Sequence, residues 1–157
     1  MEEKLVSLLQ EKNWYITTVE SCTGGLVAAS IINVSGASGV FKEGFITYAN
    51  SAKETYAGVL KETLEAYGAV SPQVAMEMAE GAAKKTGANV ALSVTGIAGP
   101  DGGTKEKPVG LVYIGCFIEG KTFYKENYFA GDRFTVRQQS AKTALAYVVE
   151  LLSRNDD

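Results

Sequence analysis

The sequence predicts an α/β fold, a three-layer α/β/α sandwich around a mixed sheet. Strand-like runs alternate with helical segments along the 157 residues, which is the pattern of strands joined by helical crossovers. The run 89–94 is apolar without strict alternation, as expected of a strand covered on both faces. Two further strands, joined by Glu119-Gly120, predict a terminal antiparallel pair. A chain of this length fits one domain over residues 1–157.

The first half of the chain predicts two helix and strand pairs. Residues 2–12 form an amphipathic helix with Leu5, Leu8 and Leu9 on one face, and 15–19 form a strand of β-branched and aromatic residues. A tight turn at 20–25 leads into an apolar helix over 26–31, with Ser21 at the bend. A second strand is expected over 40–48. Two short helical stretches should follow it and end near Gly58 and Gly68.

The second half begins with the clearest helix. Ser71 can cap it, Pro72 suits its first turn, and Gly87 stops it. After the strand at 89–94 comes a glycine-rich loop over 95–104, then strands at 110–118 and 121–129 and a last helix over 133–152. Loops that leave the carboxyl ends of parallel strands converge on one edge of a sheet. We therefore expect the turn at Ser21 to meet the loop that starts at Thr95.

Composition restricts the chemistry and the partners. The chain contains no histidine, which removes the usual base of serine and cysteine hydrolases and the commonest zinc ligand. A net charge of -3 disfavours binding to nucleic acid. The sequence has neither a signal peptide nor an apolar run long enough to cross a bilayer, so we expect a cytoplasmic protein without membrane association. Cys22 and Cys116 do not form a disulfide framework and are expected to be reduced.

The turn at 20–25 is the best candidate for a nucleophile. Ser21 precedes backbone amides that open a helix, where a developing oxyanion is well stabilised, so Cys22, Thr23, Gly24 and Gly25 are expected to bind the substrate. Alternatively, Ser21 and Thr23 are only helix caps and the glycines permit the turn. Cys22 is a rival nucleophile, but it would need a nearby cation to form a thiolate.

Without histidine, a neutral lysine is the plausible base for a serine hydroxyl. Lys53 is the candidate, and Tyr48 and Ser51 are placed to relay or position a proton. To act at neutral pH, the pKa of Lys53 must fall from about 10.4 to near neutrality, which requires burial or a nearby cation. The alternative is an ordinary surface lysine.

Two segments can bind a phosphate. The loop 95–104, with Thr95, Gly96 and Gly99, offers backbone amides, and Lys105 and Lys107 follow it, although a purely structural turn explains its glycines equally well. It has neither the Walker spacing nor the dinucleotide-binding glycine pattern. Arg133 and Arg137 begin the last helix, where the helix dipole disfavours cations, which hints at an anionic partner unless Asp132 neutralises them.

Five segments together resemble the CinA C-terminal domain family, and the resemblance covers nearly the whole chain. They are Glu-Ser-Cys-Thr-Gly-Gly at 20–25, Ile-Thr-Tyr-Ala-Asn at 46–50 with Lys53, Gly-Ala-Val-Ser at 68–71, Thr-Gly-Ile-Ala-Gly-Pro at 95–100 and Lys-Pro-Val-Gly at 107–110. The family includes bacterial nicotinamide mononucleotide deamidases. The resemblance implies a serine nucleophile at Ser21, proton transfer by Tyr48 and Lys53, a small-molecule nucleotide substrate, and no metal or organic cofactor.

The resemblance leaves other functions open. Many family members carry an extra N-terminal domain, and a standalone domain such as this one is what a dedicated deamidase would look like. The competing hypothesis is a non-catalytic module, binding nucleotides or proteins, linked to competence. A third is an amidase for a different small amide. A homo-oligomer is compatible with each of them.

Overall fold

A computed structural model, which describes residues 1–154, places five strands in one mixed sheet in the order β2-β1-β3-β4-β5. β1 pairs in parallel with both β2 and β3, whereas β4 pairs antiparallel with β3 and with β5. The strands are β1 (Ile16–Glu20), β2 (Phe41–Ile46), β3 (Val90–Gly96), β4 (Leu111–Ile118) and β5 (Lys121–Tyr128). This arrangement confirms the predicted α/β fold with a terminal antiparallel pair.

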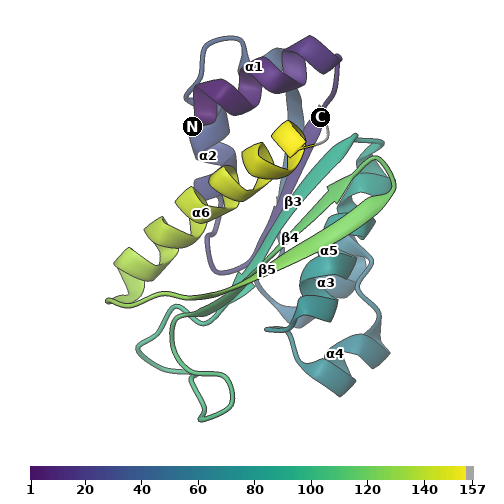
Figure 1. The fold of residues 1–157 in the computed structure, drawn as a ribbon. Coiled ribbons are helices and arrows are strands. Elements are labelled where there is room, and N and C mark those ends of the chain that lie inside the picture. The colour runs from purple at the N-terminus through teal and green to yellow at the C-terminus, as the bar shows by residue number, and fades with distance from the viewer. Residues whose placement is uncertain (155–157) are drawn as a thin grey trace.

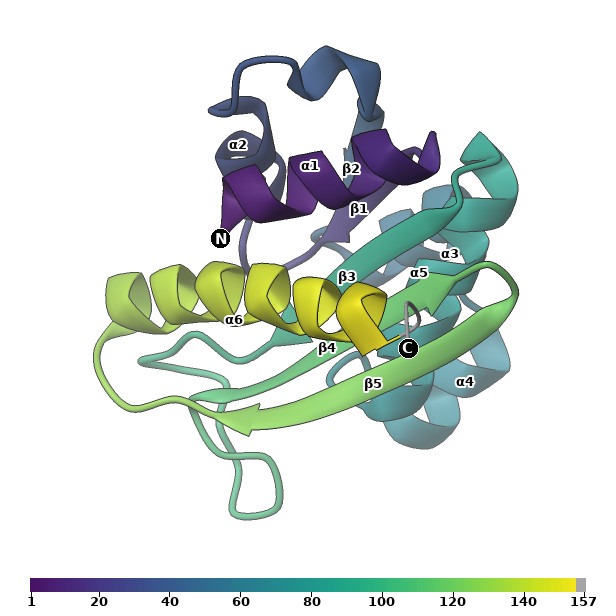
Figure 2. The same cartoon turned by 45° about the horizontal axis from the view of Figure 1, so that its top comes forward.

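Helices cover both faces of the sheet (Figures 1 and 2). One face carries α1 (Glu2–Lys12), α2 (Leu26–Ile32) and α6 (Arg133–Arg154), and the other carries α3 (Asn50–Ala57), α4 (Lys61–Tyr67) and α5 (Pro72–Thr86). A short 3-10 helix, Ala37–Gly39, precedes β2. Among the helices of residues 1–154, none is long and apolar enough to cross a membrane.

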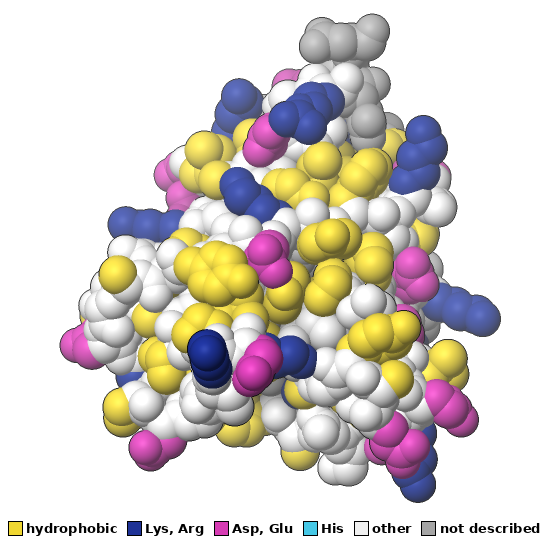
Figure 3. Space-filling view, turned by 60° about the horizontal axis from the view of Figure 1, so that its bottom comes forward, with side chains coloured by type: hydrophobic (Ala, Val, Ile, Leu, Met, Phe, Trp, Pro, Cys, Tyr) yellow, Lys and Arg dark blue, Asp and Glu magenta, His cyan; other side chains and the backbone are white. Residues whose placement is uncertain are grey.

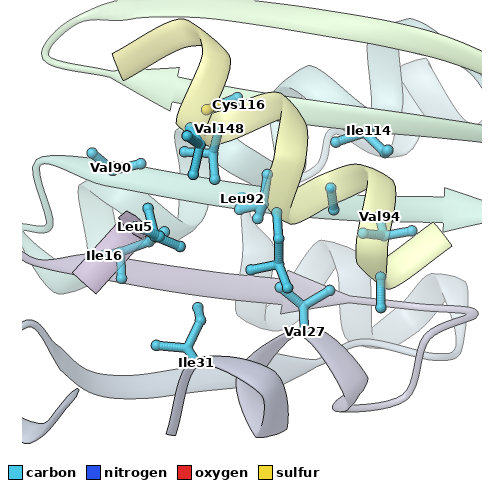
Figure 4. Packing of buried hydrophobic residues seen from close by; sticks show 14 of the residues in the cluster. Leu5, Ile16, Val27, Ile31, Val90, Leu92, Val94, Ile114, Cys116 and Val148 are labelled. Atoms are coloured by element: carbon cyan, nitrogen blue, oxygen red, sulfur yellow. The ribbon is translucent and has the colours of Figure 1, made fainter. Parts of the chain in front are cut away.

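The larger part of the core lies between the sheet and α1, α2 and α6. Figure 4 shows α6 crossing the sheet, and its Val148 belongs to the same cluster as Leu92 and Cys116. Ile16, Leu92 and Val148 are at most 1% exposed. Burial of each such aliphatic side chain stabilises the fold by about 1.5–3 kcal/mol. This packing fixes β1 and β3 against the helices of this face.

The predicted helix ends are observed. The Ser71 hydroxyl accepts a hydrogen bond from the Val74 amide at 3.2 Å, and Gly58 and Gly87 end α3 and α5 in the left-handed conformation. Gly81 explains how closely α3 lies on α5, because a Cβ there would be only 1.6 Å from the Ala57 carbonyl oxygen. This contact fixes α3, the helix that carries Lys53, against the rest of the layer.

Two strand ends differ from the expectation by two residues, whereas the other strand boundaries agree with it within one residue. The expected strand 40–48 ends at Ile46, because the carbonyls of Thr47 and Tyr48 accept hydrogen bonds from Lys53 instead of continuing a ladder. β3 runs on to Gly96, into the segment expected to be loop, because Thr95 and Gly96 still pair with β4. Both shifts lie at the carboxyl ends of parallel strands.

The strand order creates a crevice at those ends. From β1 the chain passes through α2 to β2 on one side, and it returns through the helices of the opposite face to β3 on the other side of β1. Such a reversal leaves an opening beyond the carboxyl ends of β1 and β3, where ligands bind in open α/β sheets. Ser21 directly follows β1, and Thr95 and Gly96 end β3.

Candidate active site

A cavity of about 280 Å³ lies at this crevice. Its walls come from the turn after β1, the segment from β2 into α3, the loop after β3, and the start of α6. Its lining includes Ser21, Cys22, Tyr48, Asn50, Lys53, Ala69, Val70, Thr95, Gly96, Ile97, Ala98, Gly99, Asp101, Gly102 and Arg133. The predicted meeting of the Ser21 turn with the Thr95 loop is therefore observed. The volume is near the lower end of the range for small-molecule sites, about 300–1,000 Å³.

Ser21 and Lys53 lie in contact in this cavity. Lys53 Nζ is 3.1 Å from Ser21 Oγ, although the two residues are 32 positions apart. The Lys53 side chain is only 1% exposed and that of Ser21 is 8% exposed. The surface-lysine alternative is therefore wrong. The pair has the distance required for a nucleophile and its base.

The surroundings of Lys53 Nζ favour the neutral amine more than water does. It also donates to the carbonyl oxygens of Thr47 at 2.9 Å and Tyr48 at 3.2 Å. Burial lowers its pKa from the ordinary value of 10.5, and no carboxylate of residues 1–154 forms an ion pair with it. A neutral amine would donate to the two carbonyls and direct its lone pair at the Ser21 hydroxyl. The same three contacts thus fit both the ammonium and the free base.

Tyr48 lines the cavity, but its side chain lies apart from the Ser21–Lys53 pair. The ring is 62% exposed, and its hydroxyl accepts a hydrogen bond from Arg133 Nη2 at 3.0 Å. Its contact with Lys53 is made by the main-chain carbonyl. The expected role of the Tyr48 hydroxyl in proton transfer stays a prediction. Ser51, the other expected relay, is exposed and does not line the cavity.

Glu20, which precedes Ser21, is a buried carboxylate beside the site that the sequence analysis did not single out. Its carboxylate is 1% exposed and accepts hydrogen bonds from the amides of Val27 at 2.9 Å and Ala28 at 3.1 Å. These amides belong to the first turn of α2, so Glu20 occupies the position where an anion would bind at a helix N-terminus. Ser21 and Thr23 do not cap α2, which corrects the alternative reading of this turn. These hydrogen bonds connect the end of β1, just before Ser21, to the start of α2.

The amides that remain for an oxyanion are those before the helix. Gly24 N donates to Ser21 O and Leu26 N to Thr23 O, whereas the amides of Cys22 and Thr23 donate to no carbonyl within residues 1–154. Gly24 and Gly25 have φ angles of 57° and 105°, which favour glycine and permit the sharp entry into α2. Gly24 and Gly25 therefore shape the turn, and their roles as direct substrate contacts stay predictions.

Arg137 braces this turn and does not line the cavity. Its Nε donates to Cys22 O at 2.9 Å and its Nη2 to Thr23 O at 3.2 Å. Because a trans peptide unit holds its C=O and N–H on opposite sides, the amide of Thr23 points away from Arg137. The structure does not bring Arg137 to the position expected for a phosphate ligand. It connects α6 to the backbone of the turn at residues 20–25, which we call the nucleophile turn because it contains the candidate nucleophile Ser21.

Arg133 is the arginine that lines the cavity. Its Nη1 donates to Gly99 O at 2.7 Å and its Nη2 to the Tyr48 hydroxyl. Asp132 caps α6 by accepting a hydrogen bond from the Thr135 amide at 2.8 Å. The side chain of Thr135, and then its amide, lower the pKa of Asp132. The sequence pointed to both Arg133 and Arg137, because both lie at the start of the last helix. Only the packing of α6 on the rest of the protein decides which of the two faces the cavity.

The end of β3 and the loop that follows it are held by contacts with neighbouring segments. Thr95 Oγ1 donates to Ala69 O at 2.8 Å, and a Cβ on Gly96 would lie 2.6 Å from a Val112 methyl. Gly99 has a φ of 85° and offers its carbonyl to Arg133. Lys107 donates to Tyr67 O, at the end of α4, instead of facing the cavity. Thr95, Gly96 and Gly99 line the cavity, and their binding roles stay predictions.

Cys22 is a poor nucleophile in this setting. Its side chain is 7% exposed, and burial raises the pKa of its thiol to about 11. The thiol therefore stays protonated at neutral pH, which favours Ser21 over Cys22. Within residues 1–154, no group of three or more Cys, Asp or Glu side chains is arranged to hold a metal ion.

Comparisons with known proteins agree with this architecture. Residues 1–152 match the CinA C-terminal domain. A CinA-like protein of Kosmotoga olearia is 54% identical over 148 residues, which are 94% of this chain and 36% of that protein. The chain thus spans about a third of the length of the curated relatives that it matches.

Solved structures are similar over most of their length. The competence/damage inducible protein CihA of Agrobacterium tumefaciens has a TM-score of 0.92 at 41% identity, covering 96% of this chain and 92% of that one. A CinA superfamily protein of Escherichia coli has a TM-score of 0.93 at 35% identity, covering 96% and 87%. Since both the sequence and the fold match over nearly the whole chain, the protein belongs to the CinA C-terminal domain family.

Proposed function

We propose that this protein is an amidohydrolase that converts nicotinamide mononucleotide and water to nicotinic acid mononucleotide and ammonia. The observation that carries the proposal is the buried contact of 3.1 Å between Lys53 Nζ and Ser21 Oγ at the wall of a cavity. A lysine is rarely fully buried unless it pairs with a carboxylate or has a function, and Lys53 has no such pair among residues 1–154. The nucleotide as substrate comes from the resemblance to the deamidases of the family.

The proposed reaction has two halves. Neutral Lys53 takes the proton of the Ser21 hydroxyl as Oγ attacks the carboxamide carbon, and the resulting ammonium then gives that proton to the leaving amine. Ammonia departs and leaves an acyl ester on Ser21. Water then attacks the ester carbon while Lys53 accepts one of its protons. The bond between that carbon and Ser21 Oγ breaks, Lys53 returns the proton to Oγ, and the carboxylate product is released. The carbonyls of Thr47 and Tyr48 hold the amine in place throughout.

The negative charge on the carboxamide oxygen needs donors in the transition state. The Cys22 amide is the best candidate, because Cys22 follows Ser21 in the lining of the cavity and its amide donates to no carbonyl among residues 1–154. Removal of one such donor typically costs 10²–10³ in kcat. The phosphate of the substrate is best placed at Arg133, which can exchange a neutral oxygen, Gly99 O or the Tyr48 hydroxyl, for a charged one.

Ammonia release tests the proposal. The purified protein is assayed with nicotinamide mononucleotide, its phosphate-free riboside and simple amides, alongside Ser21→Ala and a control variant, Ser30→Ala, whose hydroxyl bonds only within α2. The expected result is release that is fastest from the nucleotide, absent in Ser21→Ala and retained in Ser30→Ala. Release from another amide alone would correct the substrate, and no release from any compound would favour the non-catalytic module.

A further inference from the structure

The cavity presents two opposite charges that do not neutralise each other. Asp101 brings a carboxylate to the lining and Arg133 a guanidinium. The hydrogen bonds of Arg133 go to Gly99 O and the Tyr48 hydroxyl, and no ion pair joins Asp101 to a cation of residues 1–154. Lys53, which contacts Ser21, also lines the cavity, but it is uncharged when it acts as a base. One positive and one negative group therefore face a bound ligand.

The loop that carries Asp101 is tied to β4 and to Arg133. Ile97 N donates to Leu111 O at 2.9 Å, and Gly110 N donates to Ile97 O at 2.8 Å. These bonds tie the start of the loop, before Asp101, to the start of β4. Arg133 fixes the same loop at Gly99, two residues before Asp101. Figure 3 turns the end of the molecule that bears this loop toward the viewer, and acidic and basic side chains lie there among apolar ones.

Complementarity of charge then defines the ligand. A ligand with only a phosphate would satisfy Arg133 and leave Asp101 repelling it, whereas a ligand with a cationic ring and a phosphate meets both groups. We propose that Asp101 is a specificity-determining residue that recognises the positive charge of a pyridinium ring, so the site selects dipolar substrates. This inference rests on the proposed function and adds that the site distinguishes the oxidised pyridinium ring from the reduced ring. The reduced dihydropyridine nucleotide has the same carboxamide and phosphate, but its ring is neutral.

Binding to a catalytically silent protein isolates this effect. Calorimetry with the Ser21→Ala protein gives dissociation constants for nicotinamide mononucleotide and for its reduced form. Asp101→Asn, added to this background, is expected to weaken the oxidised nucleotide by about three- to fivefold and the reduced one by less than about twofold. The loss should shrink as salt is raised, because Asp101 is exposed. Glu106→Gln is the matched control, because Glu106 lies on the same loop outside the cavity and carries the same charge.

The outcomes separate this inference from the proposed function. Equal weakening of both nucleotides by Asp101→Asn, or the same weakening by Glu106→Gln, would overturn the role of Asp101 while ammonia release by the unmodified protein still supports the hydrolase. Charge-selective binding without ammonia release would reject the hydrolase and leave Asp101 as a ligand-selecting residue. If neither nucleotide binds, both the role of Asp101 and the proposed substrate are overturned.

Discussion

Replacement of Lys53 by methionine tests the proposed base at a calculable cost in stability. The side chain keeps its length and apolar stem, but the carbonyls of Thr47 and Tyr48 lose their donor. A buried carbonyl left without a partner costs about 1–3 kcal/mol, and the variant no longer has to bury an amine. We expect the free energy of unfolding to fall by about 1–3 kcal/mol, which a domain with about 5–15 kcal/mol tolerates at 25 °C.

The expected loss of activity is much larger than the loss of stability. Loss of the base should lower kcat by about 10³-fold or more, equivalent to about 4 kcal/mol of transition-state stabilisation. Lys53→Arg should be similarly inactive, because a guanidinium stays protonated at neutral pH. Ser21→Ala combined with Lys53→Met should be no worse than either variant alone, since residues that act as one unit are strongly non-additive.

The assay is ammonia release at saturating substrate, with circular dichroism and urea unfolding to confirm the fold. Lys61→Met, at the exposed start of α4, is the control for loss of a lysine. Full activity in Lys53→Arg would refute the reasoning, because the lysine would then supply charge and not a base. Independent, additive losses at Ser21 and Lys53 would refute the coupled pair.

The remaining predictions concern the groups around this pair. Cys22→Ala should keep most of the activity, because the thiol with a pKa of about 11 is protonated at neutral pH; inactivation with an intact fold would move the nucleophile to Cys22. Glu20→Gln should lower kcat more than it raises KM, with about 1–3 kcal/mol lost in urea unfolding, because one α2 amide loses its acceptor; unchanged kcat would contradict its positioning role. Arg133→Ala should weaken the nucleotide more than the riboside, whereas Arg137→Ala should slow both equally; the reverse pattern in substrate kinetics would return the phosphate to Arg137. Since the folded pKa of Lys53 is lower than its unfolded value of 10.5, the unfolded chain binds more protons between the two; unfolding stability should therefore rise with pH across that window in the natural protein and not in Lys53→Met.

Local signals were sufficient for most of the fold. Ser71, Pro72 and Gly87 mark both ends of α5 because capping and left-handed termination are short-range effects. The same holds for the hairpin at Glu119-Gly120, where both residues have positive φ. The end of β2 was misplaced because the carbonyls of Thr47 and Tyr48 bind the Lys53 amine, a contact that strand propensity does not describe.

The sequence predicted most residues of the candidate site, but it predicted less well which way their side chains point. Ser21 and Lys53 were paired by elimination, because a chain without histidine has few other bases. Glu20 was missed because it caps α2 from the preceding strand, seven and eight residues away, whereas sequence rules examine the residue next to the helix. Arg133 and Arg137 share the start of α6, and only tertiary packing assigns one to the cavity and the other to the nucleophile turn.

The central claim is that Lys53 is a neutral base at the pH where the enzyme works. Nuclear magnetic resonance of protein with ¹³C-labelled lysine side chains, titrated between pH 5 and 11, measures the pKa of each amine directly. The account predicts one lysine with a pKa well below those of the others, absent from Lys53→Met, whose midpoint coincides with the rise of kcat/KM with pH. If every lysine instead titrates near 10.4, Lys53 is an ammonium at neutral pH and does not accept the proton of Ser21.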